Sequence, residues 1–527
     1  MAGALARCSL LALVLIAQLV AVSCSAPRPA RRDVVVGLVG EPSSVLSEEP
    51  NARIVASAVT EELVRRDAHD ELVPRLAARV PTLENGGLQV VSDDPAAPAG
   101  RLVATFELRP GLTWQDGSPI SAADVRFAWE TERSAPLSTE ARWNAERVER
   151  VDVLDAVSAR FTYRANERWD DYALVAHVLP MHLLAGATSA QRIQYEREPM
   201  HAGPFAIAAW LPGIGITLSA FKGYALGAPA LGRIEIRFFA DRSALLDALR
   251  RGDVDVVPSP GLEADLARTL DRFADGTTLQ TFYTPSESLE VLRYGPRFSD
   301  PALREAIELA VDRRAITSDL FAGRALVPRS FLVPPAWAAA DLGAIGRLDR
   351  DAAREILQRA GYARGTFGIL ERDGDRLIAT ITVVAGSPSR TAAARLVAGD
   401  LAAIGIALDV RERPAAEVGA AIAGGTFDLA VLPEPASDPQ RAAERYAGVA
   451  GRWFDIVAQA AAASPDRTEK RVLYAELQRI WDEARPGLPL YQRLLVDVVP
   501  RSLAGVQPAP DGSPLTWDSR AWRFGTP

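Results

Sequence analysis

The chain contains few residues of the kinds that perform covalent or metal chemistry, and they do not form a familiar catalytic arrangement. No serine has a glycine two residues before it, so the G-x-S-x-G nucleophile motif is absent. H-E-x-x-H and a glycine-rich loop ending in Gly-Lys-Ser/Thr are absent too. His177 and His182 are separated by Pro180, and this spacing is poor for one metal-binding face of a helix. We therefore expect no enzyme, no metal site and no cofactor.

Acidic residues are abundant, but their arrangement assigns no acid–base role. The chain has 67 Asp and Glu against 59 Lys and Arg, which gives a net charge of −8. Closely spaced acids such as Asp253 and Asp255 are typical of a solvated surface in an acidic protein. No dense basic tract offers the charge neutralisation that nucleic-acid phosphates demand. We expect no nucleic-acid partner.

The two cysteines indicate chemistry of another kind, at the beginning of the chain. Residues 1–24 contain Arg7, an apolar run from about Ser9 to Val22, and then small residues before Cys24, which is a secretory signal pattern. The apolar run is short for a membrane-spanning helix, which needs about 20 residues. The alternative is an amphipathic or buried N-terminal helix. If the signal is removed, Cys8 leaves with it and no internal disulfide is possible.

The sequence Ala21-Val22-Ser23-Cys24 resembles the lipobox of bacterial lipoproteins, in which signal peptidase cuts before a cysteine that has received a diacylglyceryl group. This resemblance implies a signal peptide at 1–23, a lipidated tether at 24–33 and lipid attachment at Cys24. Burial of acyl methylenes, at about 0.8 kcal/mol each, would hold two or more chains in a bilayer. The expected location is the cell membrane, with the protein facing the periplasm or the cell exterior.

The elements that must position any functional side chain alternate along the chain from Asp33 onward. Apolar runs rich in β-branched residues alternate with Ala/Leu/Arg-rich stretches of helical spacing, which predicts an α/β protein. A length of 527 residues fits two to four folding units. Strands are expected at 34–40, 101–109, 233–240, 379–386 and 427–432. Helices are expected at about 52–66, 121–133, 241–251, 300–322, 349–360, 389–404 and 466–484.

The clearest local signals lie in two segments. Asp116-Gly117 suits a tight turn with positive φ, and Ser121 with Asp124 is typical of a helix start. Ser299-Asp300-Pro301 begins another helix, which Gly323 is expected to end. Taken alone, both segments are typical of scaffold.

Taken in order, these segments resemble solute-binding protein family 5 of the bacterial ABC importers, the dipeptide-, oligopeptide- and nickel-binding proteins. The pattern L-R-x-G-x-x-W-x-D-G-x-P-x-x-A-x-D-V at 108–125 is highly specific. The resemblance covers nearly the whole chain after the signal. The other matching segments are 34–45, the region ending in Leu76-Ala77, 201–218, 223–257, 299–316, 351–362 and 488–492.

The resemblance implies a two-lobe periplasmic-binding-protein fold of type II, with an extra subdomain on the first lobe and a hinge of two crossing segments. The crossings are expected near 281–289 and 489–496, where apolar β-like runs occur. The expected boundaries are 34–285 for lobe I with the subdomain at about 55–200, 286–489 for lobe II, and 490–527 for the return to lobe I.

Family resemblance also implies a function. We expect a monomeric, lipid-anchored receptor that captures a peptide or peptide-like solute between its lobes and delivers it to the transmembrane subunits of an ABC permease. The alternative is a non-transporting lipoprotein of the same fold that serves as a regulatory or assembly partner. An exported hydrolase is a more distant alternative, because no nucleophile and base can be paired.

One residue is a candidate for the amine end of a peptide ligand, and a second, Asp438, is a candidate for a ligand contact. In peptide-binding relatives, an acid in the segment after the strand at 427–432 grips the ligand's α-amino group. Here that segment ends in Asp438-Pro439, as in the relatives, but it has Pro435 where the gripping aspartate is expected. Glu434 is the nearest replacement, and its alternative role is an exposed loop carboxylate. We expect Glu434 and Asp438 at the ligand site.

One residue is a candidate for the carboxylate end. In the relatives, an arginine near the strand at 379–386 often holds the ligand's carboxylate, and a planar guanidinium suits this two-point contact. Arg390 is the nearest arginine here, and it is expected to take that role.

Overall fold

The structure is a computed structural model that describes residues 33–69, 71–92, 100–134, 139–165, 172–262, 278–435, 438–464, 466–509 and 512–525. The predicted signal peptide, Cys24 and all of the tether except Asp33 lie outside the described residues. Within the described residues, no helix is both long and apolar enough to cross a membrane.

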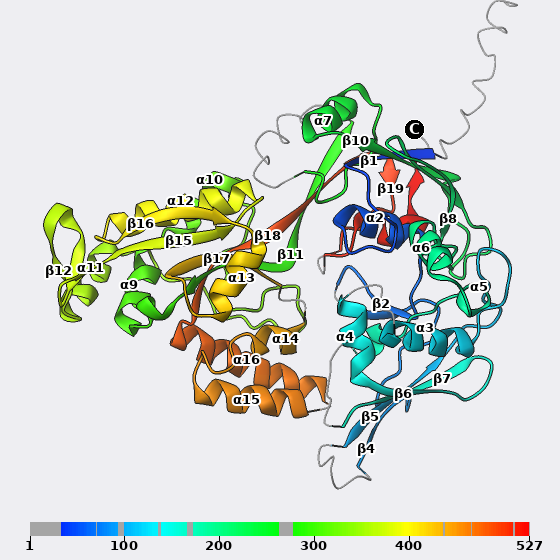
Figure 1. Cartoon of the computed structure of the whole chain (residues 1–527), viewed down its shortest axis with the longest axis horizontal. Helices are drawn as coiled ribbons and strands as arrows, with labels where there is room; N and C mark the ends of the chain where they lie inside the picture. Colours follow the sequence, from blue (N-terminus) through cyan, green and yellow to red (C-terminus); the bar gives the residue numbers. More distant parts are fainter. Residues whose placement is uncertain are drawn as a thin grey trace, which may run out of the picture.

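Three principal sheets organise the chain into two halves (Figure 1). In the first sheet, β1 pairs in parallel with β10, whereas β10, β9 and β8 pair antiparallel. Its order is β1-β10-β9-β8, with β1 at Asp33–Val39, β10 at Arg233–Phe239, β9 at Gly215–Ala220 and β8 at Phe205–Leu211. Helices of this half are α2 at Pro50–Val59, α5 at Met181–Leu184, α6 at Ser189–Arg197 and α7 at Arg242–Arg251, and α5 packs against α3 (Ala122–Ser134) of the second sheet's layer.

The second sheet lies in the same half and contains the most specific sequence pattern. Phe106, Trp114 and Phe161 are buried in its core. Gly117 has φ of +88°, as the turn requires, and Ser121 donates its N–H to Asp124 Oδ2 at 2.9 Å at the start of α3. The order is β4-β5-β7-β6, with β4 at Leu88–Val91, β5 at Arg101–Glu107, β7 at Ser158–Tyr163, β6 at Val148–Val153, and the helices α3 at Ala122–Ser134 and α4 at Thr139–Arg147.

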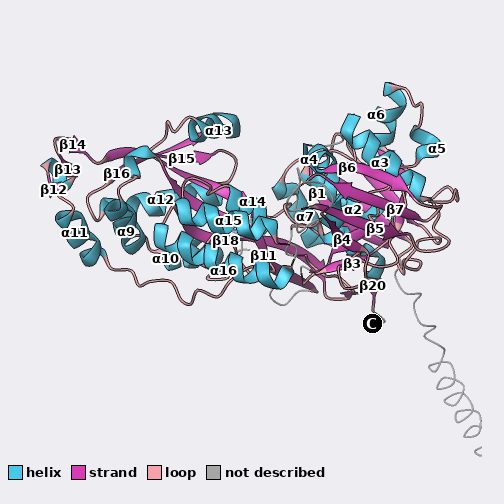
Figure 2. Cartoon of the chain, turned by 90° about the horizontal axis from the view of Figure 1, so that it is seen from below, coloured by secondary structure: helices cyan, strands magenta, loops and turns pink. Residues whose placement is uncertain are grey.

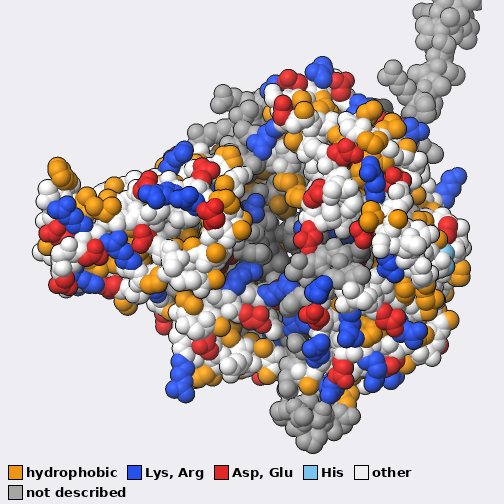
Figure 3. Space-filling view, viewed as in Figure 1, with side chains coloured by type: hydrophobic (Ala, Val, Ile, Leu, Met, Phe, Trp, Pro, Cys, Tyr) orange, Lys and Arg blue, Asp and Glu red, His pale blue; other side chains and the backbone are white. Residues whose placement is uncertain are grey.

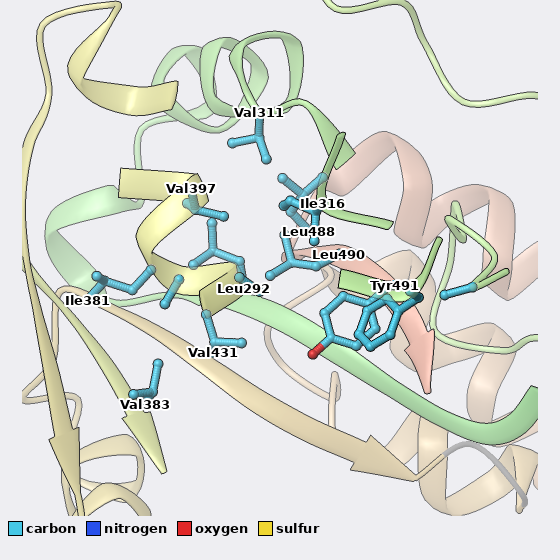
Figure 4. Close-up of a cluster of buried hydrophobic side chains, with 14 of the residues drawn as sticks. Leu292, Val311, Ile316, Ile381, Val383, Val397, Val431, Leu488, Leu490 and Tyr491 are labelled. Carbon is cyan, nitrogen blue, oxygen red and sulfur yellow. The ribbon is translucent and has the colours of Figure 1, made fainter. Parts of the chain in front are cut away.

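The third sheet forms the core of the other half. Its strands alternate in the usual way: Ile381 and Val383 are buried in the main core, whereas Thr380 and Thr382 face the other side. Figure 4 shows Ile381 and Val383 among the aliphatic side chains of that core. The order is β16-β15-β17-β11-β18, with β16 at Ala407–Arg413, β15 at Ile378–Val384, β17 at Leu429–Pro435, β11 at Leu279–Tyr294 and β18 at Gly487–Pro500.

Helices cover this third sheet through two separate apolar clusters. Leu303, Ile316 and Val397 contribute to the main cluster, whereas Phe331, Tyr446 and Trp481 belong to another that includes Leu289 and Val291 of β11. The helices are α9 at Pro301–Ala310, α10 at Arg313–Phe321, α11 at Arg350–Arg359, α12 at Pro388–Ala402, α13 at Ala415–Ala423, α14 at Pro439–Glu444, α15 at Arg452–Ala463 and α16 at Arg467–Ala484. Small sheets are formed by β2 (Val64–Arg66) with β3 (Leu72–Pro74), β12 (Ala363–Arg364) with β13 (Leu370–Arg372) and β14 (Asp375–Arg376), and β19 (Leu503–Ala504) with β20 (Arg523–Phe524).

The long strands β11 and β18 connect the two halves (Figure 2). They pair antiparallel from Leu279 opposite Pro500 to Arg293 opposite Gly487. The chain therefore leaves the first half along β11 and returns along β18. After its return, Trp522 packs in the same buried cluster as Val34 of β1. The expected lobe boundaries fall on these two strands and stay predictions as exact limits.

Two expected helices differ from the structure. The single helix expected at 300–322 is two helices, because Val311 is extended and the Asp312 side chain accepts the Ala315 N–H at 2.9 Å, which starts a new helix there. The helix expected at 52–66 ends at Val59, after which Thr60 is extended and the chain enters β2. In both cases a local break interrupts a stretch whose apolar spacing is helical.

A buried cluster of charges fixes the first half near β3. Arg75 Nη2 donates to Glu61 Oε2 at 3.0 Å and to the Tyr224 hydroxyl at 2.9 Å. Burial opposes ionisation of Glu61, but attraction to Arg75 outweighs it and lowers the pKa of this carboxyl. The Glu61 N–H also donates to His201 Nδ1 at 3.2 Å, and burial lowers the pKa of His201 to about 4. His201 therefore serves this cluster as a neutral acceptor.

We predict that Arg75→Met lowers the free energy of unfolding by about 3–5 kcal/mol, because Glu61 would stay buried without a counter-charge. Urea unfolding at pH 7 measures the change. Arg79→Met is the matched control, since Arg79 and Glu107 form an exposed pair at 2.9 Å whose loss should cost at most about 1 kcal/mol. Equal losses for the two variants would contradict the prediction.

Candidate functional site

A cavity of about 350 Å³ lies where β11 and β18 pass between the two halves. Both halves and both strands contribute to its wall, which makes it the candidate functional site. A groove of about 700 Å³ is larger, but its lining residues, such as Thr382 and Arg413, all belong to the half that contains the third sheet. The cavity is lined by Pro50, Arg53, Ser259, Pro260, Leu262, Ser286, Ser288, Phe321, Gly386, Ser387, Ser389, Tyr491, Arg493, Leu494, Leu495, Asp497, Pro508, Ala509, Gly512, Ser513, Pro514 and Leu515.

The N-terminus of α12 forms one wall of the cavity. Ser387 is the N-cap residue, and its hydroxyl accepts the Arg390 N–H at 3.4 Å. Pro388 has no N–H to leave unpaired at the first helical position. The first N–H groups of a helix lack acceptors within the helix and give this end a partial positive charge. This end of α12 therefore favours anionic groups.

A local irregularity in the β11–β18 pairing brings hydroxyl groups to the cavity. The register shifts between Pro285 and Leu289, so that Ser286 and Ser288 reach the wall. Buried Gln492 holds this irregularity, because its Nε2 donates to the Ser286 carbonyl at 2.9 Å and to the Pro334 carbonyl at 2.7 Å.

Asp497 of β18 is a buried acid at the cavity wall. Its Oδ1 accepts the Ser259 N–H at 2.8 Å. Burial raises the pKa of this carboxyl to about 7, although that hydrogen bond acts in the opposite direction. The carboxyl therefore changes charge near neutral pH.

Arg390 does not line the cavity, and a buried acid already occupies its guanidinium. Nε and Nη2 donate to the two carboxylate oxygens of Glu290 at 2.8 and 2.9 Å, and Nη1 donates to the Val384 carbonyl at 3.1 Å. This bidentate pair joins α12 to β11. The expected role of Arg390 in holding a ligand carboxylate stays a prediction.

Glu434 is buried at the end of β17, so its alternative role as an exposed loop carboxylate is wrong. Its Oε1 accepts from Arg293 Nη1 at 3.0 Å, and its Oε2 accepts from the Tyr446 hydroxyl. Burial opposes the charge on Arg293, but Glu434 outweighs it and raises the pKa of the guanidinium. Capture of a ligand amine by Glu434 stays a prediction, and it would require sharing this carboxylate with two partners.

Asp438 has a local structural task. It is the N-cap residue of α14, and its Oδ1 accepts the N–H groups of Gln440 at 2.9 Å and Arg441 at 3.1 Å. Neither Asp438 nor Glu434 is among the residues that line the cavity. The expected ligand contact of Asp438 stays a prediction.

Sequence reasoning missed the residues that do line the cavity, above all Tyr491, Arg493 and Asp497. The segment Leu488–Gln492 was recognised only as part of the family pattern and as a strand. Ser387-Pro388, directly after the strand expected at 379–386, was an available signal for a helix start at the carboxyl end of a strand. Among the described residues, no group of three or more His, Cys, Asp and Glu side chains could hold a metal ion.

Comparisons with known proteins agree with this geometry. The model of the bacterial extracellular solute-binding proteins, family 5 (middle region), matches residues 71–448. The glutathione-binding protein GsiB of Salmonella paratyphi A is 27% identical over 454 residues, which cover 80% of this chain and 82% of that protein.

Solved structures show the same fold. NikA from Brucella suis, in complex with Fe(III)-EDTA, superposes with a TM-score of 0.78 at 18% identity, over 94% of this chain and all of that chain. The oligopeptide-binding protein AppA of Bacillus subtilis, in complex with a nonapeptide, superposes with a TM-score of 0.70 at 20% identity, over 94% of this chain and 100% of that one. The predicted α/β two-lobe fold is confirmed.

We predict that Glu434→Gln lowers the melting temperature, because Arg293 would lose its charged partner in a buried place. Glu444→Gln, on the exposed side of α14, is the matched control. The predicted amine capture requires a second effect, a loss of about ten- to a hundredfold in affinity for a cationic ligand. Calorimetry on the folded variant measures it, and an unchanged affinity would contradict the capture.

Asp497 should make the protein less stable as the pH rises from about 4 to 7. The folded state holds this proton more tightly than the unfolded state, whose pKa is near 3.8, so folding loses stability as the proton leaves. The loss has an upper limit of about 4 kcal/mol. Asp497→Asn keeps an acceptor for Ser259 and should remove this loss. Urea unfolding at pH 4.5 and 8 measures both proteins, and equal pH slopes would contradict the assignment.

Proposed function

This chain belongs to the bacterial extracellular solute-binding proteins of family 5, and on that basis we propose that it captures a peptide or peptide-like solute between its lobes for delivery to an ABC permease. The observation that supports this most directly is the cavity bounded by both halves and by the two connecting strands. Its volume of about 350 Å³ lies near the lower end of the range for small-molecule sites, about 300–1,000 Å³.

The position of the cavity suits capture by closure. Within the described residues, β11 and β18 are the two strands that run from one half to the other, and a two-strand connection allows the halves to rotate toward a ligand. Away from the strands, Arg467 Nη1 and Glu71 Oε2 form an exposed ion pair at 3.5 Å between the halves. Closure would exclude water from the cavity and strengthen each polar contact inside it.

The wall chemistry suits a peptide-like solute. Hydroxyl groups of Ser288 and Ser389 can donate to carbonyl oxygens and accept from N–H groups, which is what an extended peptide backbone offers. The Ser286 hydroxyl already donates to the Arg493 carbonyl at 3.2 Å and can still accept. Phe321 and Leu262 supply apolar wall for side chains. Two similar proteins, a glutathione-binding protein and an oligopeptide-binding protein, favour the same class of solute.

We also propose a lipid on Cys24, which would hold the protein close to its permease. Eight residues lie between Cys24 and Asp33 at the start of β1. Such a tether reaches at most about 30 Å when extended. The second candidate function, a regulatory or assembly lipoprotein of this fold, would use the same anchor without ligand exchange.

The test begins with native mass spectrometry of protein purified from its own host, which should reveal a retained solute. Calorimetry of the ligand-free protein with a library of dipeptides to pentapeptides should then give binding heat. Ser288→Trp, which fills the cavity, should abolish the heat, whereas Thr382→Trp, in the larger outer groove, should not. No heat at millimolar peptide, with the protein folded and ligand-free, would leave the peptide proposal without support.

A further inference from the structure

We propose that the cavity binds its solute through a carboxylate group, which is seated between the N-terminus of α12, Arg493 and the Tyr491 hydroxyl. This inference rests on the proposed function and names the chemical group of the solute. It assigns the anionic end of the ligand to residues that differ from Arg390, which sequence comparison had suggested.

The first observation is the charge of the wall. Arg53 from α2 and Arg493 from β18 both line the cavity, together with the positive end of α12. Among the described residues that line it, Asp497 is the acid. Because burial raises the pKa of Asp497 to about 7, it offsets the positive charge only in part at neutral pH. Figure 3 shows Lys and Arg side chains, together with Asp and Glu side chains, where the two halves meet.

The second observation is that Arg493 is available to a ligand. Among the described side chains, the acid with which it pairs is Glu290, whose Oε1 lies 3.7 Å from Arg493 Nε. Both oxygens of Glu290 already accept hydrogen bonds from Arg390 at 2.8 and 2.9 Å. Half of the Arg493 side chain is exposed. Glu290 makes its two-point contact with Arg390. The guanidinium of Arg493 can therefore make such a two-point contact with a solute carboxylate.

The third observation is a buried donor without an acceptor. Tyr491 is only 2% exposed and lines the cavity, and its ring packs on Phe321 at 4.7 Å between centroids. Burial raises the pKa of its hydroxyl, which therefore keeps its proton. The nearby Ser389 hydroxyl acts in the opposite direction and lowers that pKa in part. Even so, the Tyr491 hydroxyl has no hydrogen-bond partner of normal geometry within the described part of the chain. An unpaired buried hydroxyl is costly, and a bound carboxylate oxygen would satisfy it.

The contacts of Arg390 explain why the proposed carboxylate site lies at the N-terminus of α12 and not at the Arg390 guanidinium. Its guanidinium points away to Glu290 and the Val384 carbonyl, so it cannot offer its donors to the cavity. Instead, Ser387 and Ser389 of the same helical turn reach the wall. Arg390 thus fixes the direction of α12, while the helix terminus and Arg493 face the ligand.

The test compares two peptide libraries that differ only at the carboxyl end. N-acetylated tripeptides as free acids should bind about ten- to a hundredfold more tightly than the same tripeptides as amides, by calorimetry on the ligand-free full-length protein. Arg493→Gln and Tyr491→Phe should each reduce this preference. Arg411→Gln, in the outer groove, is the control and should leave it unchanged.

Three outcomes are distinguishable. A preference for acids that Arg493→Gln removes in a folded variant supports the inference. Equal binding of acids and amides overturns the inference and leaves the proposed function in place. No binding of either library to folded, ligand-free protein counts against the proposed function, and against this inference with it.

Discussion

The antiparallel pairing of β11 with β18 is the interaction on which the rest of the molecule depends. These strands supply two of the five strands of the third sheet, and Val499 at the end of β18 packs into the core of the first half. The same ladder therefore contributes to both cores. Its one large irregularity, between Pro285 and Leu289, lies between them and is held by Gln492. The β11–β18 ladder pairs on both sides of this irregularity, and the unpaired stretch between Pro285 and Leu289 leaves room for a cavity.

Buried ion pairs near the cavity determine which charged groups remain at its wall. Arg390 with Glu290 joins α12 to β11, and Arg293 with Glu434 joins β11 to β17. Such pairs add little net stability compared with apolar packing, but the loss of one partner is costly. A charged group held in such a pair is therefore not free to bind a ligand. Arg390 and Arg293 are paired inside the lobe, and the polar groups left at the wall are hydroxyls, a helix terminus, Arg53, Arg493 and Asp497.

Local chemistry was readable from the sequence, and long-range partnership was not. Gly117 and the capping Asp300 carry their signals within a few residues, and the strand starting near Asp33 follows from its β-branched run. Glu290 and Arg390 are 100 residues apart, so no spacing could reveal that they neutralise each other. The two-lobe fold was predictable because an ordered family pattern carries long-range information. The cavity wall was not, because it depends on which polar side chains remain unpaired after folding.

Trp522 and Val34 belong to the same buried core, which affects when this core can form during folding. These residues are almost the whole chain apart, yet they share one core, to which Val499 and Leu503 also belong. Contacts between residues so far apart in sequence form slowly, because the entropy cost of closing a long loop comes before the contacts stabilise the chain. The half containing the third sheet has most of its sequence between β11 and β18 and can assemble first. The core of the first half is therefore complete only when the returning strand and the segment that ends near Trp522 are in place.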